Sequence, residues 1–327
     1  MGADDTLQHS LDATTDPREH EPNGTGSTDA IGTAGDDATE DVPATTDAAR
    51  ERWYRFAGAG LVFVGLLWFW RGFQIDGHGW GDDFSLYVNQ ARSLVQGDVG
   101  RTIADNHFAV DNSAWHTFSP YVYPWGLPLL LAPVMMLTGT VDPTTGIDFG
   151  PLKLVISLSF AVALFAFHHV CRRRVHLLGA VLLPAFFATT YWFVIHTDQI
   201  LSELPFLMWV MLFLVWLDRV RERDLLLGSD RWQLVVLGVL ALMAFSTRRE
   251  GLGLAFGLLA AQAVAVWGAT ERDTTISTTG GATDATLATR WRRLVDLDWK
   301  ALATPWATFV GGAAALQLIL PSELLPK

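Results

Sequence analysis

The stretch GDDFSLYVNQARSLVQG, residues 81–97, directly follows the first long apolar run of the chain and sets the expected architecture. From residue 84 onward, apolar side chains recur at the spacing of an amphipathic helix, which Gly97 ends. The apolar stripe consists of Phe84, Tyr87, Val88, Ala91, Leu94 and Val95. Two acids, Asp82 and Asp83, stand at the start of this helix. The pattern predicts a helix that lies on a membrane surface.

The composition indicates an integral membrane protein. Half of the 327 residues are hydrophobic, the mean hydropathy is +0.26, and the apolar residues are gathered into long runs. Residues 1–50 hold 12 acidic and 2 basic side chains, so the rest of the chain is near neutral. We therefore expect residues 1–52 to form a disordered acidic cytoplasmic tail and residues 53–327 to form the membrane domain. The charge argues against nucleic acid as a partner.

Basic residues around the apolar runs predict the topology. Arginines flank the start of the first run, residues 53–73, and favour a cytoplasmic N-terminus. The run 123–138 holds three prolines and is shorter than the roughly 20 residues that a span needs. If this run spans, the arginines at 172–174, 219–223 and 290–293 face outward. If it only dips into the outer leaflet, they face the cytoplasm, as the positive-inside rule prefers. We expect the second arrangement.

The remaining apolar runs complete an all-α membrane bundle with seven predicted spans. They are residues 53–73, 152–171, 177–196, 200–217, 232–247, 251–269 and 301–320. Juxtamembrane helices are expected in the first outer loop, residues 74–150. Residues 270–300, rich in Thr and Gly, are expected to form a polar cytoplasmic loop.

On this topology, charged and polar side chains gather at the outer face. They are Asp82, Asp83, His196, Glu203, Arg248 and Arg249. Charges at span ends are costly unless they are paired or functional. Arginine binds phosphate oxygens in a bidentate way, so the arginine pair suits a lipid-linked phosphate. A nearby carboxylate can act as general base on an acceptor hydroxyl.

Each of these residues also has a purely structural explanation. Either aspartate can cap the helix that starts at Phe84. The two arginines can anchor a span among lipid head groups, and Glu203 can stabilise the start of a helix. His196 can be a polar interface residue. No metal-ligand spacing occurs, so the pattern does not support a divalent metal, and the cofactor stays unknown.

Four stretches resemble those of the C-type membrane glycosyltransferases, in particular the dolichyl-phosphate-mannose protein mannosyltransferase and lipid A aminoarabinose transferase group. They are the spaced set Asp83, Tyr87, Ala91, Leu94 and Gly97, then YPWGLPLL at 123–130, SELP at 202–205 and TRREG at 247–251. Each stretch alone is a weak signal, whereas their order and spacing together are fairly specific. The resemblance covers residues 53–269.

The resemblance implies an inverting transferase at the outer face of the cell membrane. It would move a sugar from polyprenyl- or dolichyl-phosphate to a hydroxyl of a glycan, lipid or protein acceptor. The catalytic base would be Asp83, with its neighbour Asp82 as the second candidate, because the family often has Asp-Glu at this point. Arg248 or Arg249 would contact the phosphate. The side chains implied to line the substrate cavity are Tyr87, His196 and Glu203.

One departure from the family keeps a second interpretation open. Family members usually continue with more spans and often an outer soluble domain, whereas this sequence stops soon after residue 320. The alternative is a non-catalytic membrane scaffold or lipid-sugar-binding subunit derived from such enzymes.

Overall fold

A computed structural model describes residues 45–78, 83–112, 122–139, 141–142, 146–223, 225–228, 230–278 and 298–322. The described residues are almost entirely helical, which confirms the predicted all-α class. The exception is a small antiparallel hairpin of strands β1 (Val141–Asp142) and β2 (Gly146–Ile147). The chain divides into two units, Met1–Arg52 and Trp53–Lys327, and the helices of the candidate site belong to the second.

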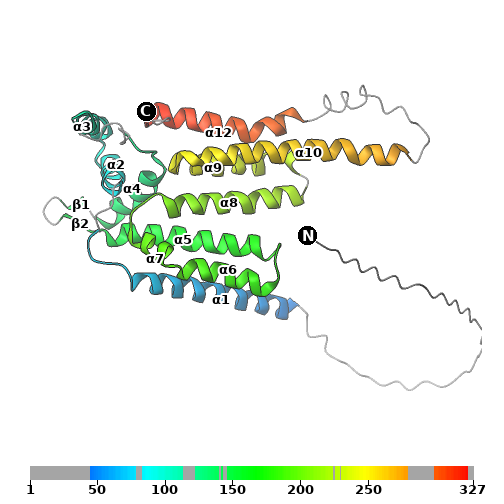
Figure 1. Ribbon diagram of the computed structural model, residues 1–327, viewed down its shortest axis with the longest axis horizontal. Coiled ribbons are helices and arrows are strands. Elements are labelled where there is room, and N and C mark those ends of the chain that lie inside the picture. The colour runs from blue at the N-terminus through cyan, green and yellow to red at the C-terminus, as the bar shows by residue number, and fades with distance from the viewer. Residues whose placement is uncertain are drawn as a thin grey trace, which may run out of the picture. The chain divides into compact units, whose positions relative to one another are not determined.

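Long helices form the body of the second unit (Figure 1). They are α1 (Thr45–Arg71), α5 (Gly150–Cys171), α6 (Leu177–Thr189), α8 (Glu203–Glu222), α9 (Arg231–Thr247), α10 (Leu252–Thr278) and α12 (Trp299–Ile319). Helix α8 packs between α5 and α9, and α12 packs along α9. The indole of Trp70 in α1 donates to the Ala188 carbonyl of α6 at 3.0 Å and packs against Phe160 of α5. These contacts place the helices side by side.

Shorter helices gather at one end of the long ones (Figure 1). They are α2 (Phe84–Gln96), α3 (Val99–Asp111), α4 (Gly126–Thr138) and α7 (Tyr191–Asp198), with the 3-10 turn η2 (Arg249–Gly251) between α9 and α10. A second 3-10 turn, η1 (Leu225–Leu227), joins α8 to α9 at the other end. Helix α2 packs mainly on α4, so this end of the bundle carries a small helical layer of its own.

Two large apolar clusters hold the described helices together, and a third, smaller one surrounds Trp125. The first joins α1, α2, α4, α5 and the start of α8, and includes the fully buried Trp70, Ile156 and Phe160. The second joins α8, α9, α10 and α12 around Phe213 and Leu237. In water, the burial of one large apolar side chain stabilises the folded state by about 1.5–3 kcal/mol. In a bilayer the same contacts act mainly through close packing.

Among the described residues, three helical segments are long and apolar enough to cross a membrane: Gly150–Cys171, Arg249–Gly268 and Trp299–Ile319. The pair α6–α7 is bent by 54° and becomes a fourth if it counts as one span. Gly58–Arg71, Gly126–Thr138 and Arg231–Thr247 are apolar but shorter. The 13 residues of α4 reach about 20 Å, less than the roughly 30 Å hydrocarbon core, in keeping with the expectation that this run does not span.

Two helices extend beyond the predicted apolar runs, although the division of the chain into two units falls at the predicted boundary between residues 52 and 53. Helix α1 begins at Thr45, so residues 45–52 of the supposed disordered tail are helical. Helix α10 runs to Thr278, so the first part of the supposed loop 270–300 is helical as well. In both places the sequence has neither Gly nor Pro, and a polar helix can continue from an apolar one until such a residue stops it. The rest of the tail and residues 279–297 lie outside the described residues.

The approach of α9 to α12 depends on Gly238 and yields a first prediction. A Cβ atom at this position would lie 2.5 Å from the Pro305 carbonyl oxygen and 2.7 Å from the Thr308 Cβ. We expect Gly238→Ala to destabilise the fold by about 1–3 kcal/mol, because the backbone of α9 or α12 must shift to make room for the new methyl group. Gly257→Ala is the control, since a Cβ there meets nothing within 4 Å. The measurement is the thermal unfolding midpoint in detergent, and equal midpoints for both variants would contradict the close contact.

Candidate functional site

Asp83 is the N-cap residue of α2, but its carboxylate does not cap the helix. No backbone N–H of the first turn donates to its side chain. Instead the Tyr123 hydroxyl donates to Oδ1 at 2.5 Å. The capping explanation therefore does not account for the position of this carboxylate. Its neighbour Asp82 lies outside the described residues.

The backbone of Tyr123 is clamped to α2 by Gln90. The side-chain Nε2 of Gln90 donates to the Tyr123 carbonyl at 3.0 Å, and the Tyr123 N–H donates to Oε1 at 3.2 Å. Gln90 is fully buried, and so is Ser93, whereas Val95 is exposed. The predicted apolar stripe of α2 is therefore partly wrong, because the buried face includes the polar groups that hold the YPWG stretch.

Tyr87 connects α2 to the SELP stretch. Its hydroxyl donates to Ser202 Oγ at 3.1 Å, and its ring lies 4.8 Å from that of Tyr123. Burial raises the pKa of Tyr87 to about 12, and the charges of Asp83 and Glu203 act in the same direction. The phenol therefore stays protonated at neutral pH and remains a donor.

Glu203 and Arg248 join the SELP and TRREG stretches. Glu203 is the first residue of α8, and its Oε1 accepts from Arg248 Nη1 at 2.5 Å. Arg248 also donates to Glu250 at 3.3 Å and 3.4 Å through Nη2 and Nε. Burial works against the charge of Arg248, but the hydrogen bonds and charges of Glu250 and Glu203 outweigh it and raise the pKa. The second oxygen of Glu203, Oε2, is buried without a hydrogen-bond partner.

This triad of Glu203, Arg248 and Glu250 lies beside an open cleft of about 470 Å³. Apolar side chains of α7 and α8, including Trp192 and Leu207, form the rest of the lining. The cleft thus combines a guanidinium and its two carboxylate partners with a mostly apolar surface. The anionic head of an amphipathic ligand can reach the guanidinium when it replaces one of these carboxylates.

His196 also lines this cleft. Its Nδ1 lies 2.6 Å from the Trp192 carbonyl oxygen of the same helix. Within the described ranges, no three His, Cys, Asp or Glu side chains group closely enough to hold a metal ion.

The two adjacent arginines of the TRREG stretch diverge. Arg248 faces the cleft, whereas Arg249 lines a small neighbouring pocket with Trp125 and Gln317. One terminal nitrogen of Arg249, Nη2, is buried without a hydrogen-bond partner. Of the two predicted phosphate contacts, only Arg248 shares a cleft with Glu203 and His196.

Two glycines allow the YPWG and TRREG stretches to meet. A Cβ at Gly126 would lie 2.6 Å from the backbone of Ser246 and Thr247, and one at Gly251 would lie 2.4 Å from the Phe245 nitrogen. Both glycines thus press against the last turn of α9. The backbone approach explains why a glycine stands in each stretch.

A buried lysine that the sequence reasoning missed, Lys153, supports the segment leading to Asp83. Lys153, in the first turn of α5, is 1% exposed and donates to Asp198 Oδ1 at 2.5 Å and to the Ile75 carbonyl at 2.8 Å. The same carboxylate oxygen accepts from the Ile75 N–H at 3.0 Å. One ion pair therefore ties α5, α7 and the segment after α1 together.

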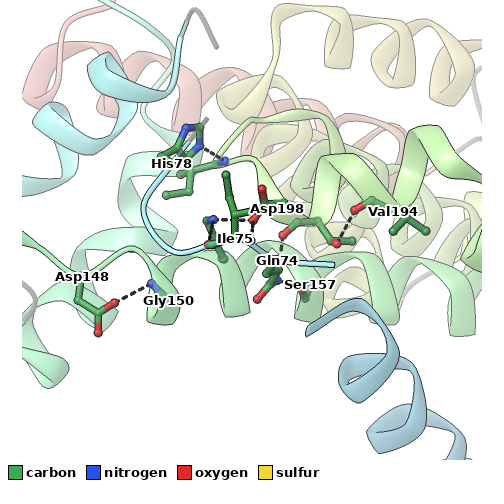
Figure 2. Close-up of polar contacts among 11 residues, drawn as sticks. Gln74, Ile75, His78, Asp148, Gly150, Ser157, Val194 and Asp198 are labelled. Atoms are coloured by element: carbon green, nitrogen blue, oxygen red, sulfur yellow. Dashed lines mark hydrogen bonds and ion pairs between the residues drawn. The ribbon is translucent and has the colours of Figure 1, made fainter. Parts of the chain in front are cut away.

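Side-chain hydrogen bonds on either side of Ile75 extend this network (Figure 2). Gln74 Nε2 donates to Ser157 Oγ at 3.0 Å and to the Thr197 carbonyl at 3.1 Å. His78 Nε2 accepts from the Ile200 N–H at 2.9 Å, and its ring stacks on Phe84 at 3.8 Å. Residues 74–78 are thus fixed to α5 and to the α7–α8 link shortly before the site begins.

The buried ion pair generates a second prediction. Lys153→Met leaves the largely buried Asp198 carboxylate without its cation, and we expect a loss of about 3–5 kcal/mol. The double variant Lys153→Met/Asp198→Asn should recover part of this loss. Arg101→Met is the control, because its pair with Asp105 is exposed and contributes less than about 1 kcal/mol. The free energy of unfolding in detergent is measured for all three variants. Equal losses of this free energy for Lys153→Met and Arg101→Met would refute a special role for the buried pair.

No family model, curated protein or solved structure matches this chain. The resemblance to C-type membrane glycosyltransferases therefore rests on the four sequence stretches. Their convergence is an independent geometric fact: Asp83 contacts Tyr123, Tyr87 contacts Ser202, and Arg248 contacts the glutamate of the SELP stretch.

Proposed function

We propose that this chain is a membrane glycosyltransferase that moves a sugar from a polyprenyl- or dolichyl-phosphate donor to an acceptor hydroxyl, with inversion at the anomeric carbon. The observation that supports the proposal is the meeting of a carboxylate, Asp83, and a guanidinium, Arg248, around Tyr87. The ring of Tyr87 packs on Tyr123, whose hydroxyl binds Asp83. The Tyr87 hydroxyl binds Ser202, the neighbour of the Glu203 that pairs with Arg248. An apolar cleft adjoins the guanidinium. Sugar transfer from a lipid phosphate needs a base, a cation for the phosphate and an apolar surface for the lipid.

The donor would lie in the 470 Å³ cleft with its phosphate on Arg248. The hydrogen bonds of Arg248 to the 64% exposed Glu250 are long, so the phosphate can replace this carboxylate on the Nε and Nη2 edge. Glu203 would keep its hydrogen bond to Arg248 Nη1, and its unpartnered Oε2 would accept a hydrogen bond from a sugar hydroxyl. The lipid chain would lie against the apolar residues of α7 and α8. Arg249, in the neighbouring pocket, is the second candidate for the phosphate contact.

Asp83 would act on the acceptor. While the Tyr123 hydroxyl holds Oδ1, the second carboxylate oxygen can accept the proton of an acceptor hydroxyl. The acceptor oxygen then attacks the anomeric carbon opposite the phosphate. The bond from that carbon to the phosphate oxygen breaks, and Arg248 stabilises the charge that the leaving phosphate gains. Asp82 remains the second candidate for the base.

The proposal includes seven spans, with the N-terminus in the cytoplasm and the site at the outer face. It adds α8, α9 and the apolar part of α1 to the four candidates above. The 17 residues of α9 reach about 26 Å and the 20 residues of α8 about 30 Å, close to the thickness of the hydrocarbon core. The arginines at 172–174 and 219–223 stand at the helix ends opposite the site, as the positive-inside rule prefers.

One observation favours the alternative of a non-catalytic lipid-sugar-binding subunit. In the structure, Asp83 and Arg248 already have protein partners, so neither group is free for substrate without an exchange of hydrogen bonds. A purified chain that binds polyprenyl-phosphate sugar but never transfers it would support this alternative.

The third prediction concerns the base. We expect Asp83→Asn to lower the transfer rate by about 10²–10⁴-fold, because general base catalysis contributes that much, while donor binding stays intact. Arg248→Gln should weaken donor binding as well as transfer. Asp105→Asn, on the exposed face of α3, is the control. The assay is transfer from labelled polyprenyl-phosphate sugar by the full chain in nanodiscs, and full activity of both Asp83→Asn and Asp82→Asn would remove the assignment.

The fourth prediction concerns the topology. In a Cys171→Ser background, single cysteines replace the exposed residues Asp76, Arg173 and Glu250. A membrane-impermeant maleimide added to intact cells should label positions 76 and 250. Position 173 should react only after permeabilisation. Labelling of position 173 from outside would invert the topology and with it the location of the site.

A further inference from the structure

A second concave site lies at the helix ends opposite Asp83. A pocket of about 710 Å³ is enclosed by the turn after α5, the last turn of α8, the 3-10 turn η1 and the middle of α10. Glu203 and Glu222 stand at the two ends of α8, so this pocket lies about 30 Å from the triad of Glu203, Arg248 and Glu250. Figure 1 shows α10 continuing past the ends of α5 and α8 on this side.

Two arginines of the pocket are held in place by acids of α8. Arg174 Nη2 lies 2.8 Å from the Asp218 carboxylate, and Arg173 pairs with Glu222. Each pair joins the turn after α5 to the end of α8. A guanidinium has five N–H donors, so each arginine keeps donors for another ligand while its position is fixed. Such pre-ordering lowers the entropy lost on binding.

A third arginine supplies the unbalanced charge. Arg221 lines the same pocket and takes part in none of the ion pairs found among the described residues. The charged residues of the described lining are three arginines against Asp218 and Glu222, which leaves one positive charge. A phosphodiester, with one negative charge, matches that excess.

The remaining lining is apolar. Ala261, Val264 and Ala265 of α10 line the pocket together with Leu226 of η1. Val264 is 63% exposed, so this face of α10 is not covered by another helix of the described chain. The pocket therefore places arginine donors next to a bare apolar strip of a candidate span, Arg249–Gly268.

We propose that this pocket binds one anionic phospholipid of the bilayer, with its phosphodiester on Arg221 and Arg174 and an acyl chain along Ala261 and Val264. Basic pockets between membrane helices recognise anionic head groups in this way, since charge and chain are satisfied together. A free phosphate would use the arginines but leave the apolar strip exposed. A zwitterionic lipid would bring its own cation toward the arginines. The site is independent of sugar transfer.

The test is native mass spectrometry of the full chain released from micelles with equal phosphatidylglycerol and phosphatidylcholine. We expect the wild-type chain to retain one phosphatidylglycerol in preference to phosphatidylcholine. Arg221→Gln should lower this retention about fivefold, because one arginine near a membrane surface contributes about that factor. Arg221 is chosen because its replacement breaks none of the ion pairs described above.

Two further variants separate the pocket from general surface charge. Val264→Trp fills the apolar strip without changing any charge, and it should lower the retention of phosphatidylglycerol. The fold should tolerate the indole ring, because position 264 is exposed. Arg231→Gln removes an exposed arginine at the same end of the bundle but outside the pocket, and it should have no effect. Equal loss with Arg231→Gln, or no loss with both pocket variants, would overturn the proposal. Equal retention of the two lipids, or displacement of the lipid by millimolar inorganic phosphate, would also overturn it.

Discussion

The arrangement of the site end depends on the buried ion pair between Lys153 and Asp198. A lysine inside a helical bundle is expensive unless an acid and hydrogen bonds satisfy it. Here both charged groups also form hydrogen bonds with the backbone of Ile75, so their hydrogen bonds are complete only when the segment after α1 is in place. Folding of α5 against α7 and placement of the segment that leads to Asp83 are therefore one event rather than two.

The helices, and several of the side chains that meet at the candidate site, could be predicted from the sequence because they have local signals. Apolar runs of 16 to 21 residues predict long helices, although the run 177–196 is broken into α6 and α7. Arginines in clusters predict the end of the bundle to which they belong. The site residues Asp83, Glu203 and Arg248 stand next to helix ends, where a charged residue is visible against an apolar run.

The supporting residues could not be predicted, for a physical reason. Gln90 and Lys153 act through hydrogen bonds to backbone groups 33 and 78 residues away, and such pairings leave no periodic trace. Lys153 had one faint signal, as one of three lysines in a chain rich in arginine. The divergence of Arg248 from Arg249 follows from a local change of backbone: Arg248 is extended at the end of α9, whereas Arg249 begins the 3-10 turn η2. A charge pattern alone treats such neighbours as equivalent.

The 54° bend between α6 and α7 has a consequence for the surface that faces the bilayer. A broken helix frees carbonyl groups that lipid cannot satisfy. The Ala188 carbonyl accepts from the Trp70 indole of α1 at 3.0 Å, and the hydroxyl of Thr190 donates to the Phe186 carbonyl at 2.6 Å. Side chains thus serve carbonyls next to the bend, where water would serve them in an aqueous protein. Beyond the bend, α7 places Trp192 and His196 in the lining of the cleft.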